Sequence, residues 1–115
     1  MTRHPDAFDE LIHSPIRLRI CAALATATAL EFTAIESALG ISTSTLSKQL
    51  KVLGEAGYVT LDKRKQPFGR PRTWASLTLQ GRHAFDAHAS ALRRLIDADP
   101  ATRNCQDLWI MISRK

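Results

Sequence analysis

The basic side chains of this sequence gather in one short stretch, and their chemistry suits an anionic partner. Between positions 42 and 74 there are seven lysines and arginines, namely Lys48, Lys51, Lys63, Arg64, Lys65, Arg70 and Arg72. The same stretch holds only two acidic residues, Glu55 and Asp62, so its excess of five positive charges equals the formal net charge of the whole chain. Ammonium and guanidinium groups bind phosphate and carboxylate oxygens, so a concentrated positive surface is predicted here.

A helix capped by Ser42 or Thr43 is predicted to carry the first part of this surface. Leu46, Leu50 and Leu53 recur at spacings of four and three, which places them on one face. The polar side chains on and beside the opposite face are Ser44, Thr45, Lys48, Gln49 and Lys51. A helix about 10–12 Å wide fits the major groove of duplex DNA, where lysine can donate to guanine, glutamine can pair with adenine, and hydroxyls can serve bases or phosphates. These residue types therefore favour a helix that reads base edges.

A β-hairpin with a basic tip is predicted to follow. Residues 58–62 and 72–77 alternate in polarity, and residues 66–71 between them contain two prolines and a glycine. The cations of the hairpin are Lys63, Arg64, Lys65, Arg70 and Arg72. They could straddle a DNA backbone and place an arginine in a narrow minor groove. For Phe68 at the tip, packing within the loop is favoured over insertion into a groove.

Two helical segments are predicted before the basic stretch. Apolar residues from Phe8 to Leu24 recur at spacings of three and four, which indicates one bent helix or two. Thr33 and Glu36 have the spacing of a capping box, so a short helix is predicted from there to Leu39, with Gly40 in the left-handed conformation that ends helices. Only a few residues separate this end from the next cap, and two helices joined so tightly form a helix-turn-helix.

A last helix is predicted from a cap at Thr78 to near Asp99-Pro100. Its apolar residues follow a heptad-like pattern, and the stripe consists of Phe85, His88, Leu92, Leu95 and Ile96. The first helix must already cover the leucines of the third helix, and a chain of 115 residues has few other surfaces to cover this stripe. We therefore predict a homodimer through this helix, with residues 1–100 as one domain and residues 101–115 as a tail of unknown structure.

Several other classes of protein are not favoured by the sequence. Cys21 and Cys105 lack the spacing of a metal-binding pair, and no apolar stretch approaches the roughly 18 residues that cross a bilayer. Ser-His-Asp arrangements, phosphate-binding glycine loops and HExxH motifs are also missing from the sequence. We therefore expect no catalysis, no cofactor, no metal and no membrane contact, and a cytoplasmic protein in which Cys21 acts as a small hydrophobe.

Three segments carry a family resemblance: Leu11–Ile20, Leu39–Leu53 and Ala56–Val59. They resemble winged-helix transcriptional regulators of the ArsR and MarR type. Residues 77–82 and Ala91-Leu92 are most similar to the compact MarR-like group that ends in one dimerisation helix. The resemblance covers roughly Leu11 to Ile96 and implies a mainly α fold with a small β-hairpin wing, which is an α+β winged helix-turn-helix.

The resemblance also implies residue roles. In that family the third helix enters the major groove, which adds Ser47 to the contacting positions Ser44, Thr45, Lys48 and Gln49. Arg70 and Arg72 correspond to wing contacts, and the first and last helices correspond to the dimer interface. Some ArsR-type sensors bind metal through a cysteine pair in the second helix, but residues 34–39 contain no cysteine. His83 and Asp86 do not complete the other ligand spacing of those sensors, so a metal site is not expected.

The predicted function is a homodimeric, sequence-specific regulator of transcription that binds double-stranded DNA. The resemblance implies a repressor or an activator, of which a repressor is favoured. The alternative is a winged-helix module whose basic face docks an acidic protein, because a charged face alone does not select its partner. Salt dependence and site preference separate the two interpretations. A DNA-binding protein loses affinity for DNA steeply as salt rises, and at fixed salt it binds its specific site about 10³ or more times more tightly than random duplex. The sequence identifies no small-molecule effector.

Overall fold

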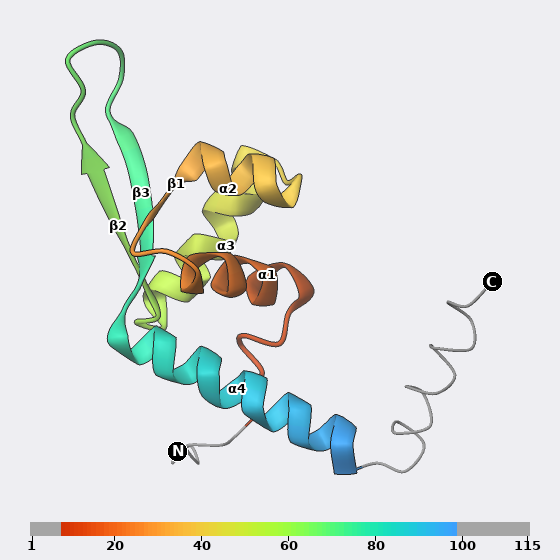
Figure 1. Ribbon diagram of the computed structural model, residues 1–115. Coiled ribbons are helices and arrows are strands. Elements are labelled where there is room, and N and C mark those ends of the chain that lie inside the picture. Colours follow the sequence, from red (N-terminus) through yellow and green to blue (C-terminus); the bar gives the residue numbers. More distant parts are fainter. Residues whose placement is uncertain (1–7, 99–115) are drawn as a thin grey trace.

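The computed structural model describes residues 8–98, which form four helices and a three-stranded antiparallel sheet (Figure 1). In chain order the elements are α1 (Pro15–Ala25), β1 (Leu30–Glu31), α2 (Phe32–Leu39), α3 (Thr43–Glu55), β2 (Val59–Arg64), β3 (Arg72–Leu77) and α4 (Leu79–Ala98). The predicted α+β winged helix-turn-helix is confirmed. The predicted tail, residues 101–115, lies outside the described residues.

The sheet has the order β1-β3-β2, and its long hairpin projects away from the helices (Figure 1). β2 and β3 pair from Val59 opposite Leu77 out to Arg64 opposite Arg72. We call β2, β3 and the loop between them the wing. The sequence predicted both of these strands, but it placed the end of the first one at residue 62, whereas β2 ends at Arg64. It missed β1, whose two residues pair with Ala75 and Trp74 and are too few to show an alternating pattern.

The core lies where α1, α2 and α3 meet the base of the sheet. Its buried apolar residues are Ile12, Ile20, Cys21, Leu24, Ile35, Leu46, Leu50, Leu53, Tyr58, Val59, Ala75 and Leu77. The three leucines of α3 are among them, as the sequence predicted. α4 begins by crossing closely over Tyr58, and a Cβ atom on Gly81 would fall within 2.9 Å of the Tyr58 Cα and nearer still to its carbonyl group. Glycine at this position therefore allows the helix to approach the sheet.

The first predicted helix is shorter than the pattern from Phe8 to Leu24 indicated. Residues 10–13 form a turn, and α1 begins only at Pro15, a position in the first helical turn that suits proline. The turn is fastened by Asp9, whose Oδ1 accepts hydrogen bonds from the amides of Leu11 and Ile12 at 3.0 and 3.2 Å. A carboxylate that binds amides two and three residues ahead gives a turn with nearly helical apolar spacing, which explains the misleading periodicity.

The predicted capping box at the start of α2 is wrong. The helix begins at Phe32, directly after β1, so Thr33 lies within its first turn and does not cap it. Glu36 instead accepts a hydrogen bond from the Thr43 hydroxyl at 3.0 Å and so ties α2 to the start of α3. The predicted end of the helix is confirmed, because Gly40 adopts a left-handed φ of 64° immediately after Leu39.

The predicted caps of α3 and α4 are confirmed. Ser42 Oγ accepts a hydrogen bond from the Thr45 amide at 3.1 Å, and Thr78 Oγ1 accepts one from the Gly81 amide at 2.9 Å. Each hydroxyl satisfies an amide that a helix leaves unpaired in its first turn. Among residues 8–98, no helix is both long enough and apolar enough to span a membrane.

Candidate nucleic-acid interface

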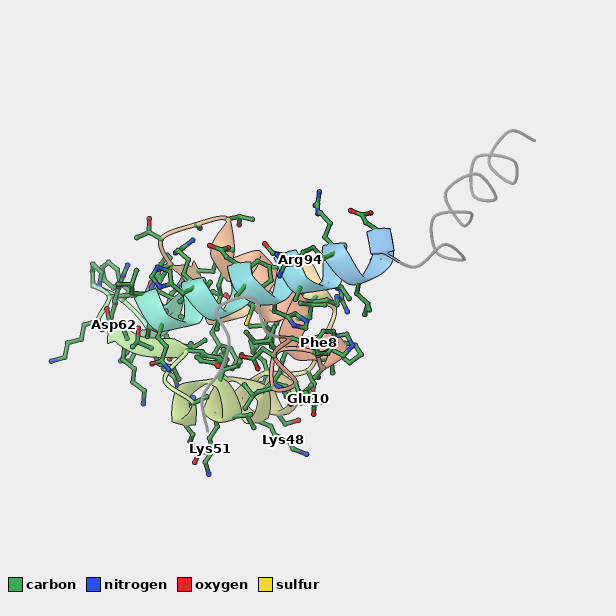
Figure 2. All side chains as sticks on the ribbon, turned by 90° about the horizontal axis from the view of Figure 1, so that it is seen from below. Phe8, Glu10, Lys48, Lys51, Asp62 and Arg94 are labelled. Atoms are coloured by element: carbon green, nitrogen blue, oxygen red, sulfur yellow. The ribbon has the colours of Figure 1, made fainter. Side chains whose placement is uncertain are left out.

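α3 presents a polar face on the side away from the core. Ser44, Ser47, Lys48 and Lys51 are exposed. Figure 2 shows Lys48 and Lys51 pointing away from the body, on the side of α3 opposite α4. The buried leucines hold the helix against the core, so its rotation about its own axis is fixed and these four side chains are left facing solvent.

The first turn of α3 contains a small network of hydroxyl groups. Ser42 Oγ donates to Thr45 Oγ1 at 2.9 Å and lies 3.2 Å from Ser44 Oγ. Thr45 is half-buried and has one oxygen lone pair occupied, whereas Ser44 stays exposed. Ser44 and Thr45 are both predicted to contact bases, and of the two Ser44 therefore has the freer hydroxyl.

Gln49 is held from behind by a residue that the sequence did not single out. Arg17 of α1 donates from Nη1 to Gln49 Oε1 at 2.8 Å and from Nε to the Leu11 carbonyl at 2.6 Å. Bidentate recognition of adenine needs the glutamine oxygen as an acceptor and its nitrogen as a donor. With the oxygen already bonded to a guanidinium group, the half-buried Gln49 offers DNA chiefly the N–H donors of its amide.

The cations of the wing fall into two groups. Arg64 pairs with Asp62 at 3.1 Å and lies over the Trp74 ring at 4.6 Å, and Arg72 pairs with Glu31 of β1 at 3.1 Å. Arg64 of β2 thus contacts β3, and Arg72 of β3 contacts β1, so these two arginines stabilise the sheet. The remaining three cations of the wing are Lys63, Lys65 and Arg70, all exposed. Within residues 8–98 none of these three has an ion-pair partner within 4.0 Å, so their charge is fully available to an anion.

A groove separates the wing from the start of α3. Its volume is about 820 Å³, and its walls include Thr43 and Ser47 from α3, residues 68–70 from the wing, and Glu31 and Glu36 from β1 and α2. The start of α3 and the basic tip of the wing therefore border one common concave surface. Such an arrangement can place a helix in one groove of a duplex while the wing follows the neighbouring phosphates.

The stripe predicted on α4 is only partly free. Leu95 and Ile96 are 60% and 45% exposed, and Phe85 and Leu92 are half-buried. His88 differs, because it is completely buried within its own chain. The prediction of His88 as a residue that faces a second copy is therefore corrected: the N-terminal segment, residues 8–14, covers it instead.

His88 joins a buried polar cluster beneath that segment. Its Nδ1 accepts a hydrogen bond from the Asp9 amide at 2.9 Å, and its Nε2 lies 3.2 Å from Nδ1 of His13. The same Asp9 accepts a hydrogen bond from the Tyr58 hydroxyl at 2.6 Å through Oδ2. Burial lowers the pKa of His88 below its usual value, and the neighbouring His13 adds to this effect while Asp9 opposes it.

Cys21 is buried in the core, as the sequence predicted for a small hydrophobe. Burial, together with the nearby Asp9 carboxylate, raises the pKa of its thiol to about 11. The thiolate is the reactive form of cysteine, so Cys21 is inert at neutral pH. Cys105 lies outside the described residues. Among the described residues there is also no group of three or more potential metal ligands.

Comparisons with known proteins show the family and the fold of the chain. A model of the winged helix DNA-binding domain family matches residues 16–96, which include α3 and the whole wing. The chain is similar to the structure of a transcriptional regulator homologue from Pyrococcus horikoshii OT3, with 27% identity, a TM-score of 0.72, and coverage of 78% of this chain and 88% of that one.

Two further structures share the fold at lower identity. The ytfH protein from Salmonella typhimurium is 23% identical, with a TM-score of 0.65 and coverage of 91% of this chain and 87% of its own. The YusO protein from Bacillus subtilis is 16% identical, with a TM-score of 0.66 and coverage of 90% and 75%. No curated protein matches the sequence.

Proposed function

This chain belongs to the winged helix DNA-binding domain family, and from that premise we propose that it is a sequence-specific regulator of transcription that binds double-stranded DNA as a homodimer. The observation that carries the proposal is the shared concave surface, on which the exposed face of α3 lies beside the basic tip of the wing. α3 enters the major groove, and the wing contacts the flanking backbone. Bound across a promoter, the protein excludes polymerase and so acts as a repressor.

The contacts divide by their chemistry. Lys48, Ser44 and Ser47 are exposed and face outward from α3, so they contact base edges, while Lys51 on the same side reaches phosphate. Thr45 and Gln49 are half-buried and bonded within the chain, so they contribute less hydrogen bonding to bases. On the wing, the three cations without acidic partners, Lys63, Lys65 and Arg70, bind phosphates, whereas Arg64 and Arg72 first stabilise the strands.

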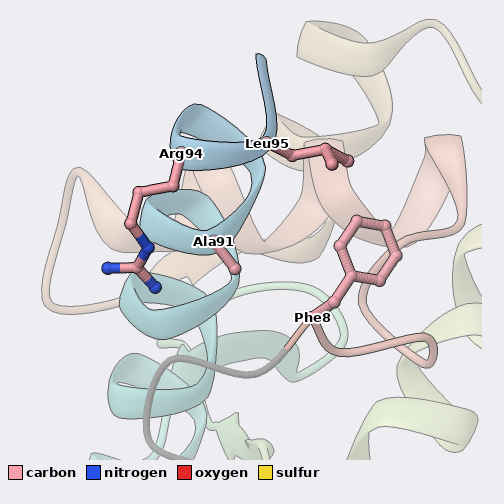
Figure 3. Close-up of a pocket in the computed structure, with 4 residues that line it drawn as sticks. All are labelled: Phe8, Ala91, Arg94 and Leu95. Carbon is pink, nitrogen blue, oxygen red and sulfur yellow. The ribbon is translucent and has the colours of Figure 1, made fainter. Parts of the chain in front are cut away.

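The homodimer is supported by the shape of the outer side of α4. Leu95 and Ile96 project into solvent between two hollows. One hollow, of about 610 Å³, is lined by Phe8, Ala91, Arg94 and Leu95 (Figure 3). The other, of about 490 Å³, lies between α1 and α4 and is lined by residues that include Leu18, Phe85, Leu92 and Ile96. A projecting leucine and isoleucine beside apolar hollows suit a two-fold contact in which these side chains of each copy fill the hollows of the other.

Selection of bound fragments from the source genome, followed by titration of the best duplex, tests the proposal. We expect the selected duplex to outbind a shuffled one by about 10³ at fixed salt. Lys48→Ala should reduce that ratio by about 5- to 150-fold, which corresponds to one base contact of about 1–3 kcal/mol. Lys63→Ala, which removes an equal charge from an exposed wing residue assigned to phosphate, is the control: it should weaken both duplexes alike and keep the ratio. Equal affinity for both duplexes would instead favour docking to an acidic protein.

Sedimentation tests the dimer separately. Leu92→Glu with Leu95→Glu places four carboxylates in the joined apolar face, so we expect a chain of 12.8 kDa that no longer self-associates. Leu79→Glu is the matched control, because Leu79 is 72% exposed at the other end of α4. In the dimer, two copies of α3 lie about 34 Å apart, so the bound site should be an inverted repeat with about 10 base pairs between half-site centres. A wild-type monomer both on and off DNA would contradict the homodimer.

A further inference from the structure

We propose that Phe68, at the tip of the wing, is a wedge that enters the minor groove and partly unstacks a base step, bending the DNA at each end of the bound site. The inference rests on the proposed function and adds a contact that reads DNA deformability and makes no hydrogen bond to a base. It concerns an apolar side chain, and it is separate from the phosphate contacts of the surrounding cations.

The first observation is exposure. Phe68 is 89% exposed, more than any other large apolar residue among residues 8–98. The expectation that its ring packs within the loop is therefore wrong. A phenyl ring in water has a large apolar area to bury, and a partner that covers the ring gains that burial without first breaking an internal contact.

The second observation is that the loop is shaped to present the ring. The Gln66 side chain donates from Nε2 to the Arg70 carbonyl at 2.8 Å and closes the loop around residues 67–69. Pro67 and Pro71 restrict the backbone on both sides, and Gly69 takes a positive φ of 83° that other residues rarely adopt. Because the backbone of the closed loop is already restricted, little backbone freedom is lost when the ring is buried, which favours its use as a contact.

The third observation is charge. The sequence contains no acidic residue from Lys63 to Phe85, so the whole tip is cationic. Apolar protein surfaces give no reason for such an excess, whereas the minor groove combines an apolar interior with two flanking rows of phosphates. Lys65 and Arg70 lie on either side of the loop and are exposed, so they can hold both phosphate rows while the ring enters between them.

The fourth observation is position. Phe68 borders the same groove as Thr43 and Ser47 at the start of α3, so the ring and the polar face of α3 address one ligand. The wing extends six paired residues from the sheet base, about 20 Å of reach at roughly 3.3 Å per residue. When α3 lies in the major groove, an arm of this length places its tip at the adjacent minor groove. A flexible pyrimidine–purine step is the base step most easily opened there.

Three variants separate a wedge from a charge contact. Phe68→Ala removes the ring, Phe68→Leu keeps an apolar wedge, and Arg70→Gln removes one cation. Both sites are exposed, so thermal unfolding of all three variants should be the same as in the wild type. The probes are the tightest-binding genomic duplex carrying end-to-end fluorophores for bending, and the same duplex carrying 2-aminopurine at successive positions, which brightens where stacking is lost.

We expect the wild type to bend the duplex and to brighten 2-aminopurine at one step on each side of the α3 contacts. Phe68→Ala should abolish both signals, weaken binding by about 5- to 150-fold and leave the salt slope unchanged, because stacking on an aromatic side chain contributes about that factor. Phe68→Leu should retain much of the bend. Arg70→Gln should keep the bend and lower the log-log salt slope by about one.

Two results would overturn the wedge while leaving the proposed function intact: specific binding by the wild type without bending or brightening, or both signals persisting in Phe68→Ala. Pelleting with vesicles of phosphatidylserine tests another use of a basic aromatic tip. Phe68-dependent binding to those vesicles without DNA bending would assign the ring to a membrane surface and refute the wedge. Failure of the wild type to prefer its selected duplex would refute the proposed function, and the wedge with it.

Discussion

Replacement of the buried His88 by leucine tests the polar cluster that anchors residues 8–14 to α4. Leucine has a similar size but offers no acceptor, so the Asp9 amide that now binds His88 Nδ1 at 2.9 Å would stay buried and unpaired. A buried donor without a partner costs about 1–3 kcal/mol. We expect His88→Leu to lower the free energy of unfolding by that amount at pH 7.5, measured by urea denaturation in a Trp109→Phe background, where Trp74 in the sheet is the only fluorescent tryptophan.

The pH dependence gives the sharper test. The pKa of His88 is lower in the folded chain than its ordinary value of 6.5, so the unfolded chain binds the proton more readily. The stability that neutral His88 contributes is therefore complete above pH 6.5 and is lost as the pH falls below 6.5 toward the folded-state pKa. One such group changes the free energy of unfolding by at most about 1.4 kcal/mol per pH unit.

The difference in free energy of unfolding between the wild type and His88→Leu should therefore shrink as the pH is lowered from 7.5 to 5.5 at one fixed protein concentration. His83→Leu is the matched control, because His83 lies on the same helix but is exposed. It should keep the wild-type dependence on pH. If His88→Leu and the wild type lose stability in parallel over this range, His88 does not remain neutral in the fold and the argument from burial fails.

Three further expectations concern separate parts of the chain. Gly81→Ala should lower the free energy of unfolding by about 1–3 kcal/mol in thermal denaturation, because the added methyl group overlaps the backbone just before β2; an unchanged midpoint would mean that α4 shifts freely. Arg72→Gln should lower the salt slope of DNA binding less than Arg70→Gln does, since Arg72 already pairs with Glu31, and equal slopes would contradict this. In a Cys105→Ser variant, Cys21 should resist a thiol reagent at pH 8 until the chain unfolds, and rapid native labelling would refute its burial.

Much of the fold was predictable because it follows from local rules. The leucine spacing of α3, the left-handed Gly40 and the hydroxyl caps at Ser42 and Thr78 each depend on residues a few positions apart. The resemblance to winged-helix DNA-binding proteins is likewise confirmed, since the family match includes the same elements. What the sequence did not predict is β1, because its pairing with β3 joins residues more than 40 positions apart.

The candidate site was predictable in its residue types but not in their partners. Periodicity identified which side of α3 faces outward, and composition located the basic wing. No spacing rule could indicate that Arg17, 32 positions away, binds the oxygen of Gln49. Likewise, the heptad-like pattern placed His88 on the apolar stripe, but it could not show that residues of the same chain cover that position.

These long-range contacts join the two surfaces on which the proposed function depends. His88 of α4 binds the amide of Asp9, and Asp9 fastens the turn that contains Leu11. The carbonyl of Leu11 accepts a hydrogen bond from Arg17, which in turn holds Gln49 on α3. The segment 8–14 is therefore packed against the helix proposed to form the dimer and bonded to the residue that orients a side chain on the DNA-reading helix. Because these contacts are contiguous, loosening the segment at His88 should free the Gln49 oxygen to accept from a base as well as destabilise the fold. We therefore expect His88→Leu to change the base preference opposite Gln49, measured by titrating duplexes substituted at that position under conditions where the domain remains folded, and an unchanged preference would refute the coupling.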